Sequence, residues 1–254
     1  MTGEKKSFPD GMSPIGDGDF SFDCHPGVEC FTVCCKDVDM ILYPYDVLML
    51  KKCLGMDSGD FMREYTFLVR GENPYFPTVK LKLKDNEEKS CPFLCENGCT
   101  VYDMRPSACR TYPLERAVDR SIVQKKANEF YFLTDHPYCL GHREKRKHTV
   151  QSWIRNQRLL GYNSMNEIWV ELDTLFMKNP WKGEGVGGEK QQLSFMVCYN
   201  IDAFREFTER HKLLGQFRID RTWKKNIATD DAELMKFGFE WLKLVLTGES
   251  KVLR

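Results

Sequence analysis

The feature that most constrains this chain is the distribution of its cysteines. The chain has 11 cysteines in 254 residues. Ligands a few residues apart close a loop around one ion at little cost in chain entropy, and metal–thiolate bonds then hold a segment with few apolar side chains of its own. The pattern therefore predicts a metal-binding region. The clustered cysteines are Cys24-x5-Cys30-x3-Cys34-Cys35 in a first group, and Cys91-x3-Cys95-x3-Cys99 followed by Cys109 and Cys139 in a second.

The cellular compartment decides how these thiols are interpreted. Met1 to Phe20 lacks the apolar core of a signal peptide, and no run of about 18 uncharged apolar residues follows. We therefore expect a cytoplasmic protein, in which clustered thiols more often bind metal or serve catalysis than form disulfides. An odd count also excludes complete internal pairing. The alternative is a secreted protein held by disulfides.

The charge balance gives no reason to expect nucleic acid or membrane as partners. Lys plus Arg and Asp plus Glu are equal at 37 each, and the pI is about 6.9. Such a chain has no global field that attracts polyanions. The basic run from His142 to Arg158 is interpreted as the solvated face of a helix. A protein partner, if there is one, is expected at the helical C-terminal region.

The number of thiols allows several kinds of metal centre. Four ligands make one tetrahedral zinc site or one cubane cluster, so the two groups suffice for two such sites or one polynuclear centre. Soft thiolates select zinc or iron–sulfur over magnesium or calcium. Zinc fingers commonly use regular cysteine pairs, and this spacing is less regular. The residues by themselves leave zinc and iron open.

Other residues near the thiols have two interpretations each. The histidines beside Cys24 and Cys139 act either as ligands or as residues that support the ligands. The arginines that flank Cys109 offset thiolate charge or form ordinary salt bridges. Nearby tyrosines are expected to shield a metal from water. These residues are His25, His136, His142, Arg105, Arg110, Tyr102, Tyr112, Tyr131 and Tyr138.

Two cysteines lie outside the groups and are predicted to belong to the hydrophobic core. Cys53 shares a predicted helix face with Leu50 and Leu54, and Cys198 lies among apolar residues 195–197. Reduced cysteine away from ligands behaves as a small apolar residue.

The hydrophobic pattern predicts an α+β protein. A flexible segment over 1–20 precedes a small, irregular, cysteine-rich metal-binding domain over 21–145, and an α-helical region over 146–254 follows, with a Gly-rich linker near 180–190. The expected elements are helices over 44–55, 150–157, 165–176, 193–214 and 230–246, a helix capped by Ser58, a short helix beginning at Pro106, and strands over 78–84, 100–102 and 130–133.

Two segments resemble the YkgJ-type cysteine-cluster family, whose domain is described as zinc- or iron-chelating. They are FDCHPGVECFTVCC, from Phe22 to Cys35, and CPFLCENGCTVYDMRPSACRTYP, from Cys91 to Pro113. The family's first motif is written C-x2-C-x2-C-C, whereas here the spacing is wider. The resemblance covers about residues 20–145, and the helical region falls outside it.

The resemblance implies a set of metal ligands. It comprises Cys24, Cys30, Cys34, Cys35, Cys91, Cys99 and Cys109, with Cys139 closing the set. Cys95 has no counterpart in the family pattern, so its role stays open. Many family members carry the label iron–sulfur protein, and one branch resembles lysine methylases.

Three functions follow from these patterns. The first is an iron–sulfur protein with a redox or electron-transfer role. The second is a zinc-stabilised structural or interaction module, whose helical region contacts a partner. The third is a metal-dependent enzyme of the lysine-methylase-like branch, for which the sequence offers no cofactor-binding segment and no substrate.

Overall fold

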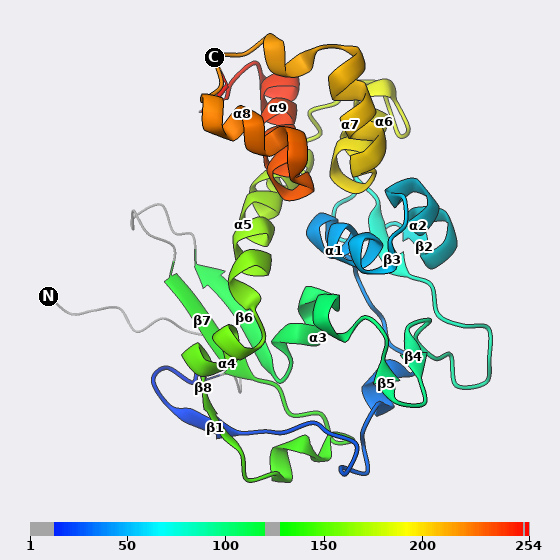
Figure 1. Ribbon diagram of the computed structural model, residues 1–254, viewed down its shortest axis with the longest axis vertical. Coiled ribbons are helices and arrows are strands. Elements are labelled where there is room, and N and C mark those ends of the chain that lie inside the picture. Colours follow the sequence, from blue (N-terminus) through cyan, green and yellow to red (C-terminus); the bar gives the residue numbers. More distant parts are fainter. Residues whose placement is uncertain (1–12, 120–127, 251, 254) are drawn as a thin grey trace, which may run out of the picture. The chain divides into compact units, whose positions relative to one another are not determined.

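The computed structural model describes residues 13–119, 128–250, 252 and 253. These residues form helices and pairs of short antiparallel strands, so the α+β prediction is confirmed (Figure 1). Most of the predicted N-terminal segment lies outside the described residues. The chain divides into two compact units: unit 1 comprises Met1–Cys34, Glu96–Gly98 and Ser107–Leu160, and unit 2 comprises Cys35–Cys95, Cys99–Pro106 and Gly161–Arg254.

Unit 1 is built from two antiparallel strand pairs and short helices. Strand β1 (Asp19–Ser21) pairs with β8 (Lys147–Thr149), and β6 (Leu114–Asp119) pairs with β7 (Asn128–Leu133). The helices are α3 (Ser107–Thr111) and α4 (Val150–Asn156). The core is small: its buried residues are Phe20, Phe22, Leu114, Tyr131, Val150, Trp153 and Leu159.

Hydrogen bonds attach α3 to α4 within unit 1. The Trp153 indole donates to the Thr111 carbonyl at 3.0 Å. From the other helix, the buried Arg110 guanidinium donates to the Gln157 carbonyl at 2.7 Å. Because both donors are charged or ring N–H groups with little solvent access, these bonds fix the position of α3.

Unit 2 contains most of the helices. Early in the chain come α1 (Pro44–Leu54), α2 (Ser58–Tyr65) and the antiparallel pair β2 (Thr66–Val69) and β3 (Thr78–Leu81). The strands β4 (Leu94–Cys95) and β5 (Gly98–Cys99) form a short hairpin. Helix α5 (Leu159–Phe176) is followed by α6 (Glu189–Tyr199), α7 (Ile201–Arg210), α8 (Arg221–Thr229) and α9 (Asp231–Thr247).

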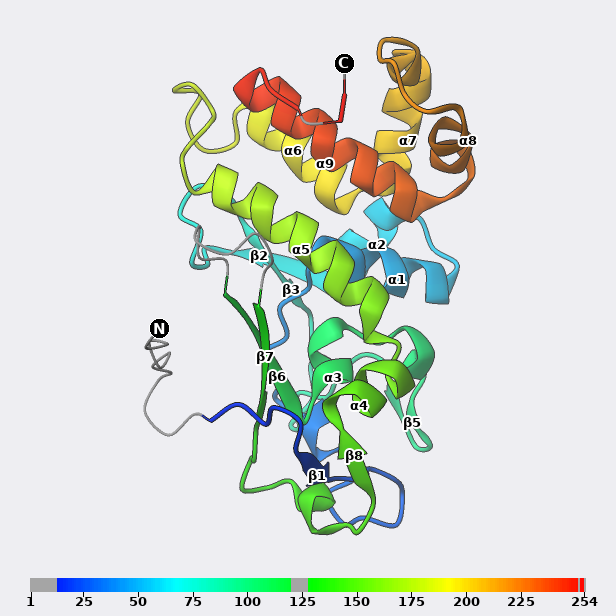
Figure 2. The same ribbon diagram turned by 90° about the vertical axis from the view of Figure 1, so that its left-hand side faces the viewer.

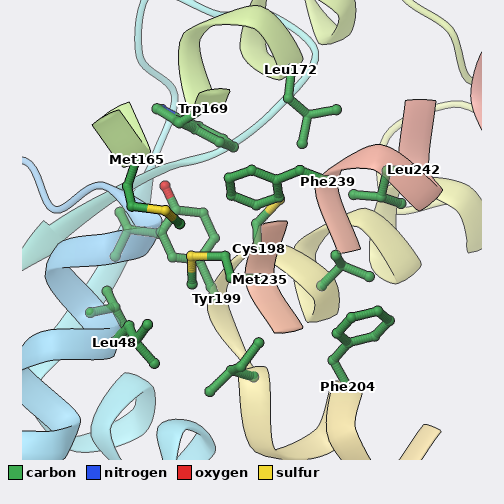
Figure 3. Packing of buried hydrophobic residues seen from close by; sticks show 14 of the residues in the cluster. Leu48, Met165, Trp169, Leu172, Cys198, Tyr199, Phe204, Met235, Phe239 and Leu242 are labelled. Atoms are coloured by element: carbon green, nitrogen blue, oxygen red, sulfur yellow. The ribbon is translucent and has the colours of Figure 1, made fainter. Parts of the chain in front are cut away.

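The core of unit 2 joins segments that are far apart in the sequence. Helices α1 and α2 pack against α6, α7 and α9 (Figure 2). Leu48 of α1 faces Tyr199 of α6 and Met235 of α9 in this core (Figure 3). The described helices include none long and apolar enough to cross a membrane.

The best-predicted elements carry strong end signals. Helix α1 begins with Pro44 and ends at Gly55, whose φ of 64° is a left-handed cap. Helix α9 is capped by Asp230, whose side chain accepts two backbone N–H groups. The short helix after Pro106 also forms.

Four predicted boundaries were wrong. The N-cap of α2 is Asp57 and not Ser58, since the Asp57 carboxylate accepts the backbone N–H groups of Gly59 and Asp60. The predicted helix over 193–214 is two helices, interrupted at Asn200. The break before α5 falls at Arg158, with φ of 52°, so the helix predicted over 165–176 begins at Leu159. The predicted strand over 100–102 lies earlier, as β5.

Candidate metal centre

The predicted ligands are divided between the two units. Unit 1 holds Cys24, Cys30, Cys34, Cys109 and Cys139, whereas unit 2 holds Cys35, Cys91 and Cys99, together with Cys95. None of these cysteines is fully buried.

In unit 1, the first cysteine loop is fixed against the segment that contains Cys139. The Asp23 N–H donates to the Gly141 carbonyl at 3.1 Å, and the Phe22 N–H donates to the Arg146 carbonyl at 2.9 Å. A Cβ at Gly141 would lie 2.7 Å from the Asp23 carbonyl oxygen, so only glycine allows this approach. Cys24 therefore follows directly on a segment that is hydrogen-bonded beside Cys139.

A backbone donor reaches a thiol in the same place. The Leu140 N–H donates to Cys30 Sγ at 3.1 Å. Because Leu140 follows Cys139 in the chain, this bond brings two predicted ligands into one neighbourhood. Hydrogen bonds to sulfur stabilise thiolates and tune the metals that thiolates bind.

The pKa values of two tyrosines are affected by thiols of unit 1. Burial raises the pKa of Tyr138, and the negative charges of Cys34 and Cys139 raise it further. Burial also raises the pKa of Tyr112 well above its usual range, and the nearby Cys139 thiol adds to the effect. Cys34 and Cys139 therefore both lie in the electrostatic range of Tyr138.

Aromatic rings form a stack beside Cys139. The rings of Tyr112 and His136 are 5.6 Å apart and tilted by only 5°, and those of His136 and Tyr138 are 5.1 Å apart and tilted by 9°. His142 lies at the edge of this stack, with Nε2 at 3.3 Å from the Tyr112 hydroxyl. The sequence predicted that Tyr112 and Tyr138 lie near the thiols, but gave no sign of the stack.

Cys109 lies on α3, the helix held by Trp153 and Arg110. The structure places its thiol at the surface of unit 1. Arg110 is buried, and its bond to the Gln157 carbonyl helps to hold α3. The Trp153 bond ends on Thr111, two residues after Cys109.

In unit 2, backbone pairing brings two predicted ligands together. The Cys91 N–H donates to the Cys35 carbonyl at 2.7 Å. Burial raises the pKa of the Cys99 thiol, and the charges of Cys53 and Cys95 add to this, while Arg105 opposes it. Cys95, whose role the sequence left open, thus lies in the electrostatic range of Cys99.

The two cysteines outside the clusters have opposite environments. Cys198 is completely buried in the core of unit 2, as predicted (Figure 3). Cys53, predicted to be a core residue, is exposed. The prediction for Cys53 was wrong because it is the penultimate residue of α1, where the buried face of the helix ends.

The histidines have other neighbours. His25 Nδ1 accepts the Gly27 N–H at 3.1 Å, and its Nε2 lies 3.7 Å from Glu144. His142 Nε2 lies 3.7 Å from Asp135. Whether any histidine is a ligand stays a prediction.

The donor chemistry fits a soft metal, because unit 1 carries five of the clustered thiols and one of them, Cys30, accepts a backbone N–H. In residues 13–119, 128–250, 252 and 253, however, no three His, Cys, Asp or Glu side chains are arranged to hold one ion. The structure thus brings the cysteine-bearing loops together, and the ligand set stays a prediction.

A pocket of about 590 Å³ lies elsewhere, between α5 and the end of α9 in unit 2. Lys243 in its wall bonds Glu171 at 2.9 Å and Glu240 at 2.8 Å. Its lining residues include no cysteine, so it is separate from the predicted ligands.

The comparisons with known proteins point to the same region. Residues 23–140 match the family model CxxCxxCC, described as a "putative zinc- or iron-chelating domain". No curated protein and no solved structure matches the chain. The matched stretch contains all eight predicted ligands.

Proposed function

We propose, with the CxxCxxCC domain over residues 23–140 as the premise, that this chain holds an iron–sulfur cluster and uses it in redox or electron-transfer chemistry. The observation that carries the proposal is the bond from the Leu140 N–H to Cys30 Sγ, beside Cys139. Hydrogen bonds to sulfur are among the features that set the potentials of such clusters. The irregular cysteine spacing differs from the regular pairs of zinc fingers, and we take iron as the first candidate and zinc as the second.

The thiols of unit 1 are the proposed first ligands. Leu140, which follows Cys139, donates its N–H to Cys30. Cys34 and Cys139 both lie in the electrostatic range of Tyr138. Cys24 follows Asp23, whose N–H is bonded to the Gly141 carbonyl. When bound, the cluster supplies a site that gains and loses one electron. The protein supplies thiolates, donors to sulfur and an aromatic wall beside Cys139.

A zinc-stabilised module is the second candidate, favoured by the small core of unit 1. A region with few buried apolar residues gains much of its stability from a structural metal. In this alternative the metal has no redox role, and the helices of unit 2 contact a partner protein.

Metal analysis of protein purified without oxygen separates the two candidates. We expect a brown protein with broad visible absorbance that contains iron and acid-labile sulfide. A colourless protein with stoichiometric zinc would exclude the iron–sulfur proposal and support the zinc module.

Matched serine variants locate the ligands in the same experiment. Cys30→Ser should lower the iron content severalfold, because it removes a thiol beside Cys139. Cys53→Ser, which changes an exposed cysteine outside the predicted set, should keep the iron. Equal iron content in Cys30→Ser and the unmodified protein would show that Cys30 is not a ligand.

A further inference from the structure

A segment of unit 2 is strongly basic although the whole chain is neutral. Residues 210–225, from the last residue of α7 into α8, contain six Lys or Arg side chains and one carboxylate, Asp220. We call these residues the basic segment. Its six cations are all exposed: Arg210, Lys212, Arg218, Arg221, Lys224 and Lys225.

The positive charge of the basic segment is not neutralised within unit 2. Across residues 13–119, 128–250, 252 and 253, none of its six cations forms an ion pair. On the neighbouring α7, by contrast, Arg205 is paired with Asp231 at 2.6 Å. The carboxylate of Asp220 accepts the backbone N–H of Trp223 as the N-cap of α8. The charge is therefore available to an anion from outside.

The packing of α8 directs its cations to solvent. Trp223 and Ile227 form the inner side of the helix, since the Trp223 indole donates to a carboxylate of α9 at 2.9 Å and Ile227 is buried. Arg221, Lys224 and Lys225 have the spacing i, i+3, i+4, so they form a row on the opposite side. Figure 1 shows α8 beside α9 in the C-terminal part of the chain.

This row opposes the stability of α8 in the free protein. Like charges three and four residues apart repel each other on a helix. Arg221 is also the first residue of α8, where the positive end of the helix dipole disfavours a cation. A bound anion would relieve both effects, so the arrangement suits binding better than it suits the isolated helix.

The surroundings of the basic segment favour a short acidic segment of a protein over nucleic acid or a membrane. Exposed carboxylates border it on both sides, at Glu209 and Asp230, and they would repel a polyanion that extends past it. Residues 187–250 expose no large hydrophobic side chain, and Phe217 and Trp223 pack against the core. The segment thus offers neither an apolar anchor for a bilayer nor a free ring for base stacking.

We propose that residues 210–225 bind an acidic segment of a partner protein, with the row of Arg221, Lys224 and Lys225 at the centre of the contact. Binding at this surface is independent of which metal the chain holds. Exposed charges mainly speed association and select the partner, and salt screens them. The contact is therefore weak and depends on salt.

Fluorescence anisotropy of a dye-labelled peptide rich in Glu tests this inference with the full-length protein. We expect the peptide to bind, its affinity to fall as the salt concentration rises, and its Gln counterpart not to bind. Lys224→Glu combined with Lys225→Glu should weaken binding about 10-fold, because two attractive charges become repulsive. If circular dichroism shows that this variant unfolds, Lys224→Gln with Lys225→Gln replaces it, with a smaller loss expected.

Lys52→Glu combined with Lys178→Glu is the matched control. Both lysines are exposed in unit 2 and lie outside the basic segment, and the net charge equals that of the first variant. The control should keep the affinity for the peptide. If the two variants lose affinity equally, only the net charge matters and the inference is wrong.

Two further results overturn the inference. In the first, the unmodified protein does not bind the acidic peptide even at low salt. In the second, duplex DNA or vesicles that contain phosphatidylserine bind more tightly than the peptide and lose affinity in the same variant, which would assign the segment to nucleic acid or membrane. Neither result affects the proposed metal centre, because metal content is measured separately.

Discussion

At the residue scale, identical side chains have different chemistry because their burial differs. Cys53 and Cys198 both lie in helices close to apolar residues, and both were predicted to be core residues. Only Cys198 is buried, between α6 and the other core helices of unit 2. A single sequence shows the helical period but not where the neighbouring helix ends.

Alkylation should separate these two thiols. In the native protein, iodoacetamide should modify Cys53 and leave Cys198 unmodified, because burial excludes the reagent and raises the pKa of the Cys198 thiol. Mass spectrometry of the digested protein measures both sites. In denaturant both should react. Rapid native modification of Cys198 would contradict the predicted core.

Cys198 should also make the protein less stable at alkaline pH. Its thiol has a raised pKa when folded and ionises near pH 8.5 when unfolded. Its stabilising contribution is therefore complete below that pH and is lost as the pH rises. Between its unfolded and its folded pKa, a group of this kind lowers the free energy of unfolding by about 1.4 kcal/mol for each unit by which the pH rises. Urea unfolding at pH 8 to 10 should show a shallower loss for Cys198→Ala.

At the element scale, an ionic network joins early and late helices of unit 2. Lys51 of α1 lies 3.0 Å from Asp202 of α7 and 3.3 Å from Asp231 of α9. Ser58, at the start of α2, donates to Asp202 through both its backbone N–H and its hydroxyl at 2.7 Å. The sequence suggested that Ser58 caps α2. Nothing near Ser58 in the sequence reveals that its partner lies 144 residues away.

Removal of Asp202 should loosen this helix junction. Asp202→Ala leaves the buried Lys51 with one carboxylate and removes the acceptor of two hydrogen bonds from Ser58. We therefore expect a loss of about 2–4 kcal/mol in the free energy of unfolding. Circular dichroism in urea measures it.

The control is Arg63→Ala, which removes an exposed ion pair with Asp60. It should cost less than about 1 kcal/mol. Equal effects of the two variants would show that the network does not stabilise the junction.

The charge of Asp202 makes the free energy of unfolding depend on pH in the acid range. Burial raises its pKa, but the hydrogen bonds from Ser58 and the pairing with Lys51 outweigh burial, and the net shift is downward. This contribution is complete above the unfolded pKa of about 3.9 and is lost as the pH falls below it. Asp202→Asn should therefore lose less stability between pH 5 and pH 3 than the unmodified protein.

At the scale of the whole molecule, the two units have different sources of stability. The core of unit 2 extends over α1, α2, β3 and five later helices, whereas unit 1 buries only a few apolar side chains. Metal bound in unit 1 would thus contribute a larger share of that unit's stability.

Removal of the metal should affect the two units unequally. After chelation, hydrogen exchange should accelerate in residues 13–34 and 128–156, whereas α6 and α9 should keep their protection. Mass spectrometry of peptic peptides measures each segment. Equal acceleration in both units would contradict this expectation.

The sequence by itself determined the α+β class, the chemistry of the cysteine groups and the helices with strong caps, such as α1 and α9. These features depend on neighbours within a few residues, where spacing and end signals are visible. It did not reveal the Leu140 bond to Cys30, because 110 residues separate the two partners.

Only the tertiary structure decided which cysteine-bearing segments meet. It placed the adjacent Cys34 and Cys35 in different compact units, exposed Cys53, and paired the Tyr112 hydroxyl with His142. The physical reason is the same in each case. Burial and hydrogen bonding depend on segments that the fold brings together, and spacing along the chain carries no record of them.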